Sequence, residues 1–174
     1  MNRRNVISSM VMGAAAAATV GVARAAGPVI DNLVTHWKKS KDLTLKVAEA
    51  MPEADYDYKP FPEARTFGGE LVHLAQAEGY YLGNFGKATA PKAPAAGEMT
   101  KPAVIKYLGE NYDWAIGVVS SLTDADLTKT FKARDNTVTG LDLLYGAMIH
   151  TAHTRGYTEM FLRNKGITPP TYSV

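Results

Sequence analysis

The stretch LLYGAMIHTAHTRGYTEMFLRNKGITPP, residues 143–170, decides the fold that the sequence predicts. It reads as one long helix and carries two of the four histidines of the chain. Thr139 is the expected N-cap of this helix, because a threonine hydroxyl accepts hydrogen bonds from free backbone N–H groups of the first turn. Gly166 and the pair Pro169-Pro170 are expected to end it, since glycine suits the left-handed C-terminal position and proline cannot continue a helix.

Two stripes of residues run along this helix at steps of three and four, and residues at this spacing share one side of a helix. The first stripe, expected to face a bundle interior, contains Leu143, Ala147, His150, Thr154, Tyr157 and Phe161. The second stripe, roughly opposite, contains Leu141, Tyr145, Met148, Ala152 and Gly156. We therefore expect the helix to bury two faces, either at the centre of the fold or against a second copy of the chain. His153 lies between the stripes.

Three further helices are predicted from the same spacing and from residues that start and stop helices. They cover residues 28–50, 67–87 and 101–122. Thr66 and Thr100 are the expected N-caps of the second and third helices. No segment alternates apolar and polar residues for long enough to predict a strand. The sequence therefore predicts an all-α four-helix bundle, with long connections between helices one and two and between helices three and four.

The length and composition fit one domain, residues 27–174. With 174 residues and 46% hydrophobic residues, the chain can bury an ordinary core. It has no cysteine, which excludes disulfides, thiolate metal ligands and a thiol nucleophile. Removing Arg3, Arg4 and Arg24 from the 19 basic residues leaves 16 against 17 acidic ones. This balance gives no support to nucleic-acid binding.

Residues 1–26 are predicted to be a signal peptide. They combine the basic pair Arg3-Arg4, an apolar segment over residues 11–22 and the cleavage signal Ala23-Arg24-Ala25. The paired arginines resemble a twin-arginine signal, and the general secretory route is the alternative. We expect export to the periplasm. No later segment is apolar enough to span a membrane, so no membrane span is expected after cleavage; an uncleaved N-terminal anchor is the alternative.

Two histidines stand out by their position on predicted helix faces. His73 lies on a face that also carries Glu70 and Tyr80, which is too polar for an ordinary core face. His150 lies on the first stripe of the last helix. The pair could bind a metal ion, or the two side chains could be buried and hydrogen-bonded to neighbouring tyrosines and to Thr154.

Two segments resemble the DinB/YfiT-like superfamily of bacterial four-helix proteins, many of which are proposed metalloenzymes. The segments are YDYKPFPEARTFGGELVHLAQAE, residues 56–78, and HTAHTRGYTEMFLRNKGITPP, residues 150–170. The resemblance implies the bundle fold, with a first metal ligand at His73 and a second at His150. It places the third ligand, a histidine in the family, at Thr154, where this sequence departs from the pattern.

The departure at Thr154 changes the expected metal chemistry. A neutral hydroxyl is a much poorer ligand for zinc, nickel or iron than an imidazole. His153 is a candidate replacement, because it follows His150 by three residues on the same helix, although it is directed away from the face of His150 and Thr154. Glu70 is another candidate. The expected cofactor is a divalent metal ion, zinc, nickel or iron, held by His73, His150 and one further ligand.

Three functions remain open from the sequence. The first is a metal-dependent enzyme, with thiol transferase or hydrolase chemistry implied by the family resemblance. The second is a non-catalytic module that binds a small molecule and has lost tight metal affinity. The third is a structural bundle that forms a homodimer through the second stripe of the last helix. The sequence identifies neither the small molecule nor the reaction.

Overall fold

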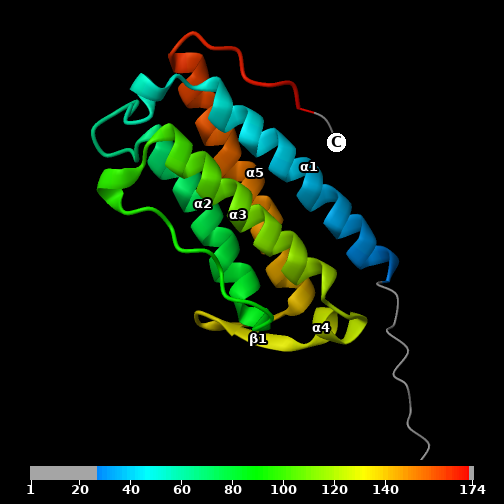
Figure 1. The fold of residues 1–174 in the computed structure, drawn as a ribbon. Coiled ribbons are helices and arrows are strands. Elements are labelled where there is room, and N and C mark those ends of the chain that lie inside the picture. The colour runs from blue at the N-terminus through cyan, green and yellow to red at the C-terminus, as the bar shows by residue number, and fades with distance from the viewer. Residues whose placement is uncertain (1–26, 173–174) are drawn as a thin grey trace, which may run out of the picture.

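The computed structural model describes residues 27–172, and the predicted signal peptide, residues 1–26, lies outside this part. Four long helices form a bundle: α1 (Pro28–Ala50), α2 (Phe67–Leu82), α3 (Lys101–Ser120) and α5 (Gly140–Asn164). α1 and α2 each pack against both α3 and α5 (Figure 1). The predicted four-helix bundle is confirmed. Within the described residues, no helix combines the length and the apolar character that a membrane crossing requires.

The connections between the helices set their directions. Residues 51–66, with the short 3₁₀ helix η1 (Glu53–Asp55), join α1 to α2 at one end of the bundle. Between α2 and α3 the chain crosses the whole length of the bundle, through η2 (Gly83–Phe85) and η3 (Ala96–Glu98) (Figure 1). α2 and α3 therefore run in the same direction, and α1 and α5 run in the opposite one.

The predicted helix caps are largely present. The Thr66 hydroxyl accepts a hydrogen bond from the backbone N–H of Gly69 at 3.0 Å. Thr139 and Asp142 form a reciprocal capping box, in which the Thr139 backbone N–H donates to Oδ2 of Asp142 at 2.8 Å. Gly166 adopts a φ of +74°, the left-handed conformation expected after a helix. These contacts are local, which is why the sequence predicts them.

The second helix is shorter than predicted. Its α-helical part ends at Leu82 and not at residue 87, and the 3₁₀ turn η2 follows. Gly86 closes this turn with a φ of +64°. Thr100 does precede α3 as predicted, but its side chain makes no capping hydrogen bond.

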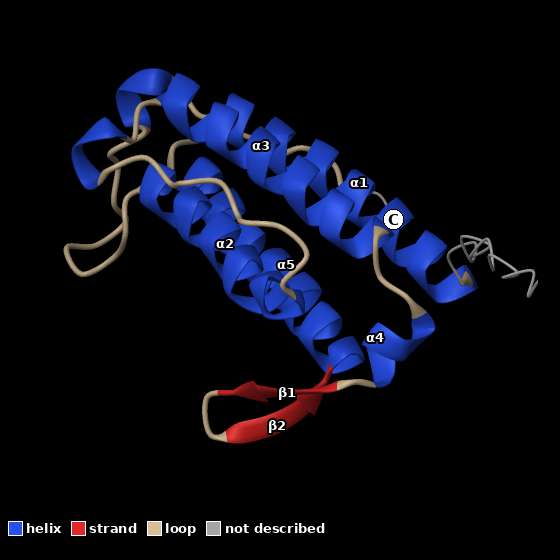
Figure 2. Cartoon of the chain, turned by 60° about the horizontal axis from the view of Figure 1, so that its bottom comes forward, coloured by secondary structure: helices blue, strands red, loops and turns tan. Residues whose placement is uncertain are grey.

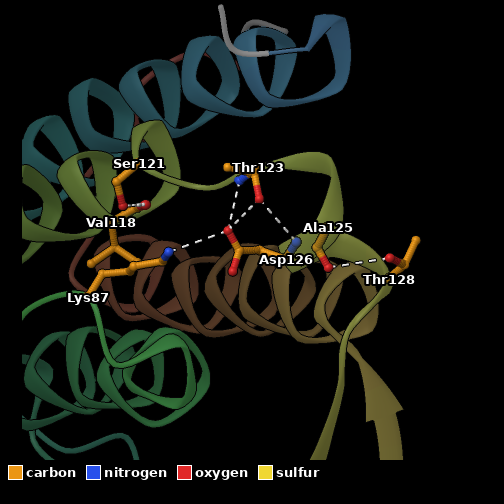
Figure 3. Close-up of polar contacts among 7 residues, drawn as sticks. All are labelled: Lys87, Val118, Ser121, Thr123, Ala125, Asp126 and Thr128. Carbon is orange, nitrogen blue, oxygen red and sulfur yellow. Dashed lines mark hydrogen bonds and ion pairs between the residues drawn. The ribbon is translucent and has the colours of Figure 1, made fainter. Parts of the chain in front are cut away.

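The connection between α3 and α5 contains a short helix, α4 (Asp124–Thr128). Thr123 caps it in a reciprocal capping box: the Thr123 hydroxyl accepts from the backbone N–H of Asp126 at 3.4 Å, and the Thr123 backbone N–H donates to Oδ2 of Asp126 at 2.9 Å (Figure 3). Lys87 reaches the same oxygen from the α2–α3 connection at 3.4 Å (Figure 3). These bonds, led by the one from the Thr123 backbone, hold the pKa of Asp126 below its usual range. α4 is thereby fixed to the rest of the bundle.

The prediction that the chain has no strand is wrong. β1 (Thr130–Ala133) and β2 (Asn136–Thr139) form an antiparallel hairpin in which Phe131 pairs with Val138 (Figure 2). Each strand has four residues, too few to show a clear two-residue alternation. Threonine, valine and phenylalanine nevertheless favour extended backbone. The hairpin lies at the end of the bundle where α5 begins (Figure 2).

The prediction that α5 buries two opposite faces is also wrong. Tyr145 of the second stripe is 51% exposed, and Ala152 and Gly156 are exposed as well. The helix instead buries one broad face, which includes Leu143, Ala147, Thr154 and Phe161 of the first stripe; Tyr157, predicted to lie on it, is 51% exposed. The additional members of this face lie beside the first stripe and are Leu144, Thr151, Arg155, Thr158 and Leu162. Three of these are polar, so apolar periodicity does not reveal them. The homodimer stays a prediction.

Glu78 on α2 is hydrogen-bonded to each of the other three long helices. Its side chain is 1% exposed. Oε1 accepts a hydrogen bond from Nε1 of Trp37 on α1 at 3.1 Å and one from the hydroxyl of Thr151 on α5 at 3.5 Å. Oε2 accepts from Nδ2 of Asn111 on α3 at 2.8 Å. One buried carboxyl therefore connects all four helices.

Burial raises the pKa of the Glu78 carboxyl from 4.5 to about 8, although its three hydrogen bonds oppose the rise. The carboxyl is therefore mostly uncharged at neutral pH. Between pH 4.5 and about 8 the folded chain holds a proton that the unfolded chain has lost. The contribution of Glu78 to the free energy of unfolding consequently falls as the pH rises through this window.

Glu78→Gln is expected to remove this pH dependence. The new amide keeps an acceptor oxygen for Trp37 and Thr151. Once the Asn111 amide, which now donates through Nδ2, turns over, the new NH₂ group can donate to Oδ1 of Asn111, a buried atom with no partner in residues 27–172. Between about pH 5 and 8 the wild type should lose on the order of a few kcal/mol of stability relative to the variant. Thermal unfolding of both proteins across this range measures the difference. Parallel curves of melting temperature against pH would contradict the assignment.

Gly140→Ala is expected to destabilise the junction between the hairpin and α5. A Cβ at this position would overlap the backbone oxygen of Asp126, which cannot move without displacing α4. Overpacking that forces backbone to shift typically costs about 1–3 kcal/mol. Gly156→Ala on the same helix is the control: a Cβ there meets open space, so this variant should gain about 0.5–1 kcal/mol. Chemical denaturation measures both, and equal effects would contradict the expectation.

Candidate functional site

The structure brings together the two histidines that the sequence singles out. His73 on α2 and His150 on α5 lie face to edge, with ring centroids 5.1 Å apart and an interplanar angle of 72°. The Tyr81 ring lies 6.4 Å from that of His150. Both histidines are partly buried, and His150 sits at the margin of the buried face of α5, not in its centre as the first stripe suggests. The antiparallel packing of α2 and α5 produces this pair.

Thr154, where the resemblance places the family's third ligand, contacts His150. Its hydroxyl lies 3.3 Å from Nδ1 of His150, and its side chain is 2% exposed. The two residues are one helical turn apart, so the contact follows from the helix itself. A hydroxyl that accepts from Nδ1–H leaves the lone pair of Nε2 free. Thr154 can therefore orient the His150 ring.

The structure does not place His153 beside the pair. His153 is exposed, and its ring packs edge-on against Tyr157 with centroids 4.7 Å apart. Glu70 is buried one turn before His73, where it accepts a hydrogen bond from Nη1 of Arg65 at 3.2 Å. Throughout residues 27–172, no three His, Asp or Glu side chains are grouped as metal ligands. Two imidazoles are thus what the structure brings to the site.

The electrostatic surroundings favour neutral imidazoles. Burial lowers the pKa of His73, and the nearby Arg65 lowers it further, while Glu70 acts in the opposite direction. Burial likewise lowers the pKa of His150, with smaller contributions from His73 and His153. At neutral pH both rings therefore keep a free nitrogen lone pair, which a metal ion or a hydrogen-bond donor requires.

The histidine pair lies in the wall of a pocket of about 420 Å³. α2 contributes Gln76, Tyr80 and Tyr81, and the hairpin contributes Arg134 and Asn136. The Arg134 guanidinium lies over the Tyr80 ring, 5.9 Å from its centroid. At the base of the hairpin, Phe131 packs against Phe85, with ring centroids 5.1 Å apart. The hairpin is therefore fixed as one wall of the pocket.

The sequence interpretation missed several residues of this pocket. Gln76 follows His73 by three residues, so helical spacing could have placed it on the same side. Arg134 and Asn136 come from the hairpin, and no signal in the sequence connects them with the histidines.

Comparisons with known proteins agree with the fold and the motifs. A family model described as the DinB superfamily matches residues 36–157. Two similar solved structures are a DinB-like protein from Bacillus cereus and a DinB-like protein from Bacillus subtilis. The first has a TM-score of 0.74 at 18% sequence identity, and the match covers 83% of this chain and 97% of the B. cereus chain. The second has a TM-score of 0.66 at 19% identity and covers 81% and 96%, respectively.

At these identities the two structures support the fold alone. A comparison with curated proteins gave no match. The family model, however, covers well over half of the chain and includes both His73 and His150. The chain therefore belongs to the DinB superfamily.

Proposed function

We propose that His73 and His150 bind one divalent metal ion, zinc, nickel or iron, and that the chain is an exported metal-dependent transferase or hydrolase. The observation that carries the proposal is the approach of two imidazoles from different helices, 5.1 Å between centroids, in the wall of one pocket. Imidazole is a common ligand of all three metals.

Three features of the site support metal binding. The lowered pKa values of both histidines favour the neutral form that coordinates metal. The Thr154 hydroxyl at Nδ1 of His150 resembles the partners that orient metal-binding histidines through their second nitrogen. Two protein ligands also leave coordination positions open for water and substrate. A bound divalent ion would act there as a Lewis acid or lower the pKa of a bound water.

Polar side chains around the pair are suited to bind a small molecule. The guanidinium of Arg134 offers donors for an anionic group, and Asn136 and Gln76 offer both donors and acceptors. Tyr80 and Tyr81 supply aromatic walls. The substrate would thus lie between α2 and the hairpin, beside the histidine pair.

A second candidate function is a non-catalytic small-molecule-binding module with a degenerate metal site. The contact between Thr154 and His150 favours it, because a hydroxyl stands where the family has a third imidazole. Two imidazoles alone bind divalent ions more weakly than three. The pocket and its polar residues would then bind the ligand without a metal.

We also propose that residues 1–26 direct export to the periplasm. The basic pair, the apolar segment and the Ala23-Arg24-Ala25 signal support this proposal. In a bacterial host the full chain should appear, shortened by these residues, in the periplasmic fraction. Deleting residues 1–26 should retain the chain in the cytoplasm. Arg3→Lys together with Arg4→Lys should block export if the route is the twin-arginine one. Cytoplasmic retention of the full chain would contradict export.

His73→Ala and His150→Ala are expected to weaken metal binding by more than about tenfold each, because even the loss of a partner behind a ligand costs 10–100-fold. Calorimetric titration of the metal-free chain with zinc, nickel or iron(II) measures the affinity, and metal analysis gives the stoichiometry. His36→Ala is the control, since His36 lies on α1 and outside the pocket. Absence of metal binding by the wild type, or an equal loss in the control, would contradict the metal site.

Thr154→His separates the two candidate functions. The substitution places a third imidazole one turn after His150, so metal affinity should rise by more than about tenfold. Thr154→Ser, which keeps the hydroxyl, should leave the affinity unchanged. Metal binding by the wild type supports the proposed metal-dependent enzyme. Metal binding by Thr154→His alone supports the degenerate module, and an unchanged affinity in Thr154→His contradicts the assignment of this position.

A further inference from the structure

A second, smaller cavity lies between α1, α2 and α5 and shares no residue with the histidine pocket. Its volume is about 100 Å³. A liquid water molecule occupies about 30 Å³, so the cavity has room for a few waters or for one small organic molecule. The cavity opens to the surface beside Lys39, Ala152 and Tyr172, which line it and are exposed. The polar part of the wall consists of Glu78, Arg155, Ser40, Thr151, Lys39 and His36.

Arg155 is a buried cation with an incomplete set of partners. Its side chain is 6% exposed. Nη1 donates to the hydroxyl of Ser40 at 3.0 Å and reaches that of Thr44 at 3.5 Å. Its ion-pair partner is Glu159, but Nε and Oε1 are 3.9 Å apart and the carboxylate is a quarter exposed. A guanidinium has five N–H groups, so these contacts leave donors free at the cavity wall.

The other carboxyl in the cavity wall does not neutralise Arg155. The three hydrogen bonds of Glu78 come from Trp37, Asn111 and Thr151, and no ion pair joins Glu78 to Arg155 within the described residues. With a pKa of about 8, Glu78 is mostly uncharged at neutral pH. A buried charge without a close counter-ion is costly. Glu159 at 3.9 Å is the one counter-ion that the described residues give Arg155, so the cavity is a positively charged site with room for an anion.

We propose that this cavity binds one small organic monocarboxylate, with the carboxylate on the guanidinium of Arg155. A planar guanidinium matches the two oxygens of a carboxylate and can donate to both. The hydroxyl of Ser40 borders the same site. The apolar part of the wall, from Trp37, Leu43 and Met148, accepts a short alkyl group. Acetate and propionate are ligands of this size and chemistry. The proposal does not depend on the metal site.

Ionisation of Glu78 should oppose binding, because it places a negative charge in the same cavity. The other groups that face this region are His36 and Lys39 on α1, Arg155 and Glu159 on α5, and Tyr172 near the C-terminus. On α3, burial raises the pKa of Tyr107 and of Tyr112, so both phenols stay neutral in this range. Since the uncharged fraction of Glu78 falls from about 0.9 at pH 7 to about 0.1 at pH 9, the apparent dissociation constant should rise about tenfold.

Calorimetric titration of the chain with sodium propionate, at constant ionic strength, tests the proposal. We expect saturable binding of one propionate per chain, weaker binding of acetate, and none of chloride or of the uncharged isostere propionamide. Arg155→Lys should weaken binding more than about tenfold, because lysine cannot donate to both oxygens from a planar group. Arg163→Lys, an exposed arginine of the same helix, should bind as the wild type does. Absence of saturable propionate binding, or binding in Arg155→Lys equal to wild type, would overturn the proposal.

Three further variants separate this site from its alternatives. Glu78→Gln should bind propionate equally at pH 7 and pH 9, whereas His36→Gln should keep the tenfold dependence; the reverse result would overturn the role of Glu78. His73→Ala should bind propionate like the wild type, because the histidine pocket lies elsewhere. Loss of propionate binding in His73→Ala would place the anion on a metal ion and overturn the proposal. Retained binding leaves it standing even if the chain binds no metal.

Discussion

The buried carboxyl of Glu78 imposes a constraint on the whole bundle. A polar group at this depth must have hydrogen-bond partners, and its three partners come from three different helices. Sliding any one helix along its axis by a residue would leave at least one of these groups unpaired in the core. Thr151, which reaches Glu78, is the neighbour of His150. The register that satisfies the carboxyl is therefore also the register in which His150 meets His73.

The parts of the fold that the sequence predicts are those determined by local chemistry. Thr66, Thr139 and Gly166 mark helix ends because a cap depends on residues within one turn of it. The face of α5 that carries Leu143, Ala147 and Phe161 follows from helical spacing. The contact between His73 and His150 cannot be predicted from spacing alone, because spacing shows only that each residue lies on a helix face. The family resemblance supplied the pairing between the two helices.

The parts that the sequence does not predict depend on partners distant in the chain. Arg155 and Thr151 can be buried because they form hydrogen bonds with other helices: Arg155 with hydroxyls of α1, and Thr151 with the carboxyl of Glu78. A search for apolar residues therefore does not identify either of them. The prediction for the second stripe of α5 is wrong for the opposite reason: Tyr145 is large and apolar, yet no neighbouring helix in residues 27–172 covers it, and it is 51% exposed. The hairpin is too short for a periodic signal. Its contribution to the pocket, through Arg134 and Asn136, could not be predicted without the fold.

The hairpin has a consequence for how such a protein can diverge. Its two strands pair only with each other in the described chain, and it joins the bundle through α4 on one side and Gly140 on the other. Phe131 also packs on Phe85, and Arg134 at the tip lies over Tyr80. None of residues 130–139 is buried, however, so residues at the tip can be exchanged without altering the packing of the helix core. The pocket thus consists of a constant wall from the bundle and a replaceable wall from the hairpin. If the pocket binds a small molecule as proposed, ligand preference and folding stability lie on separate segments, which natural or laboratory selection can change independently.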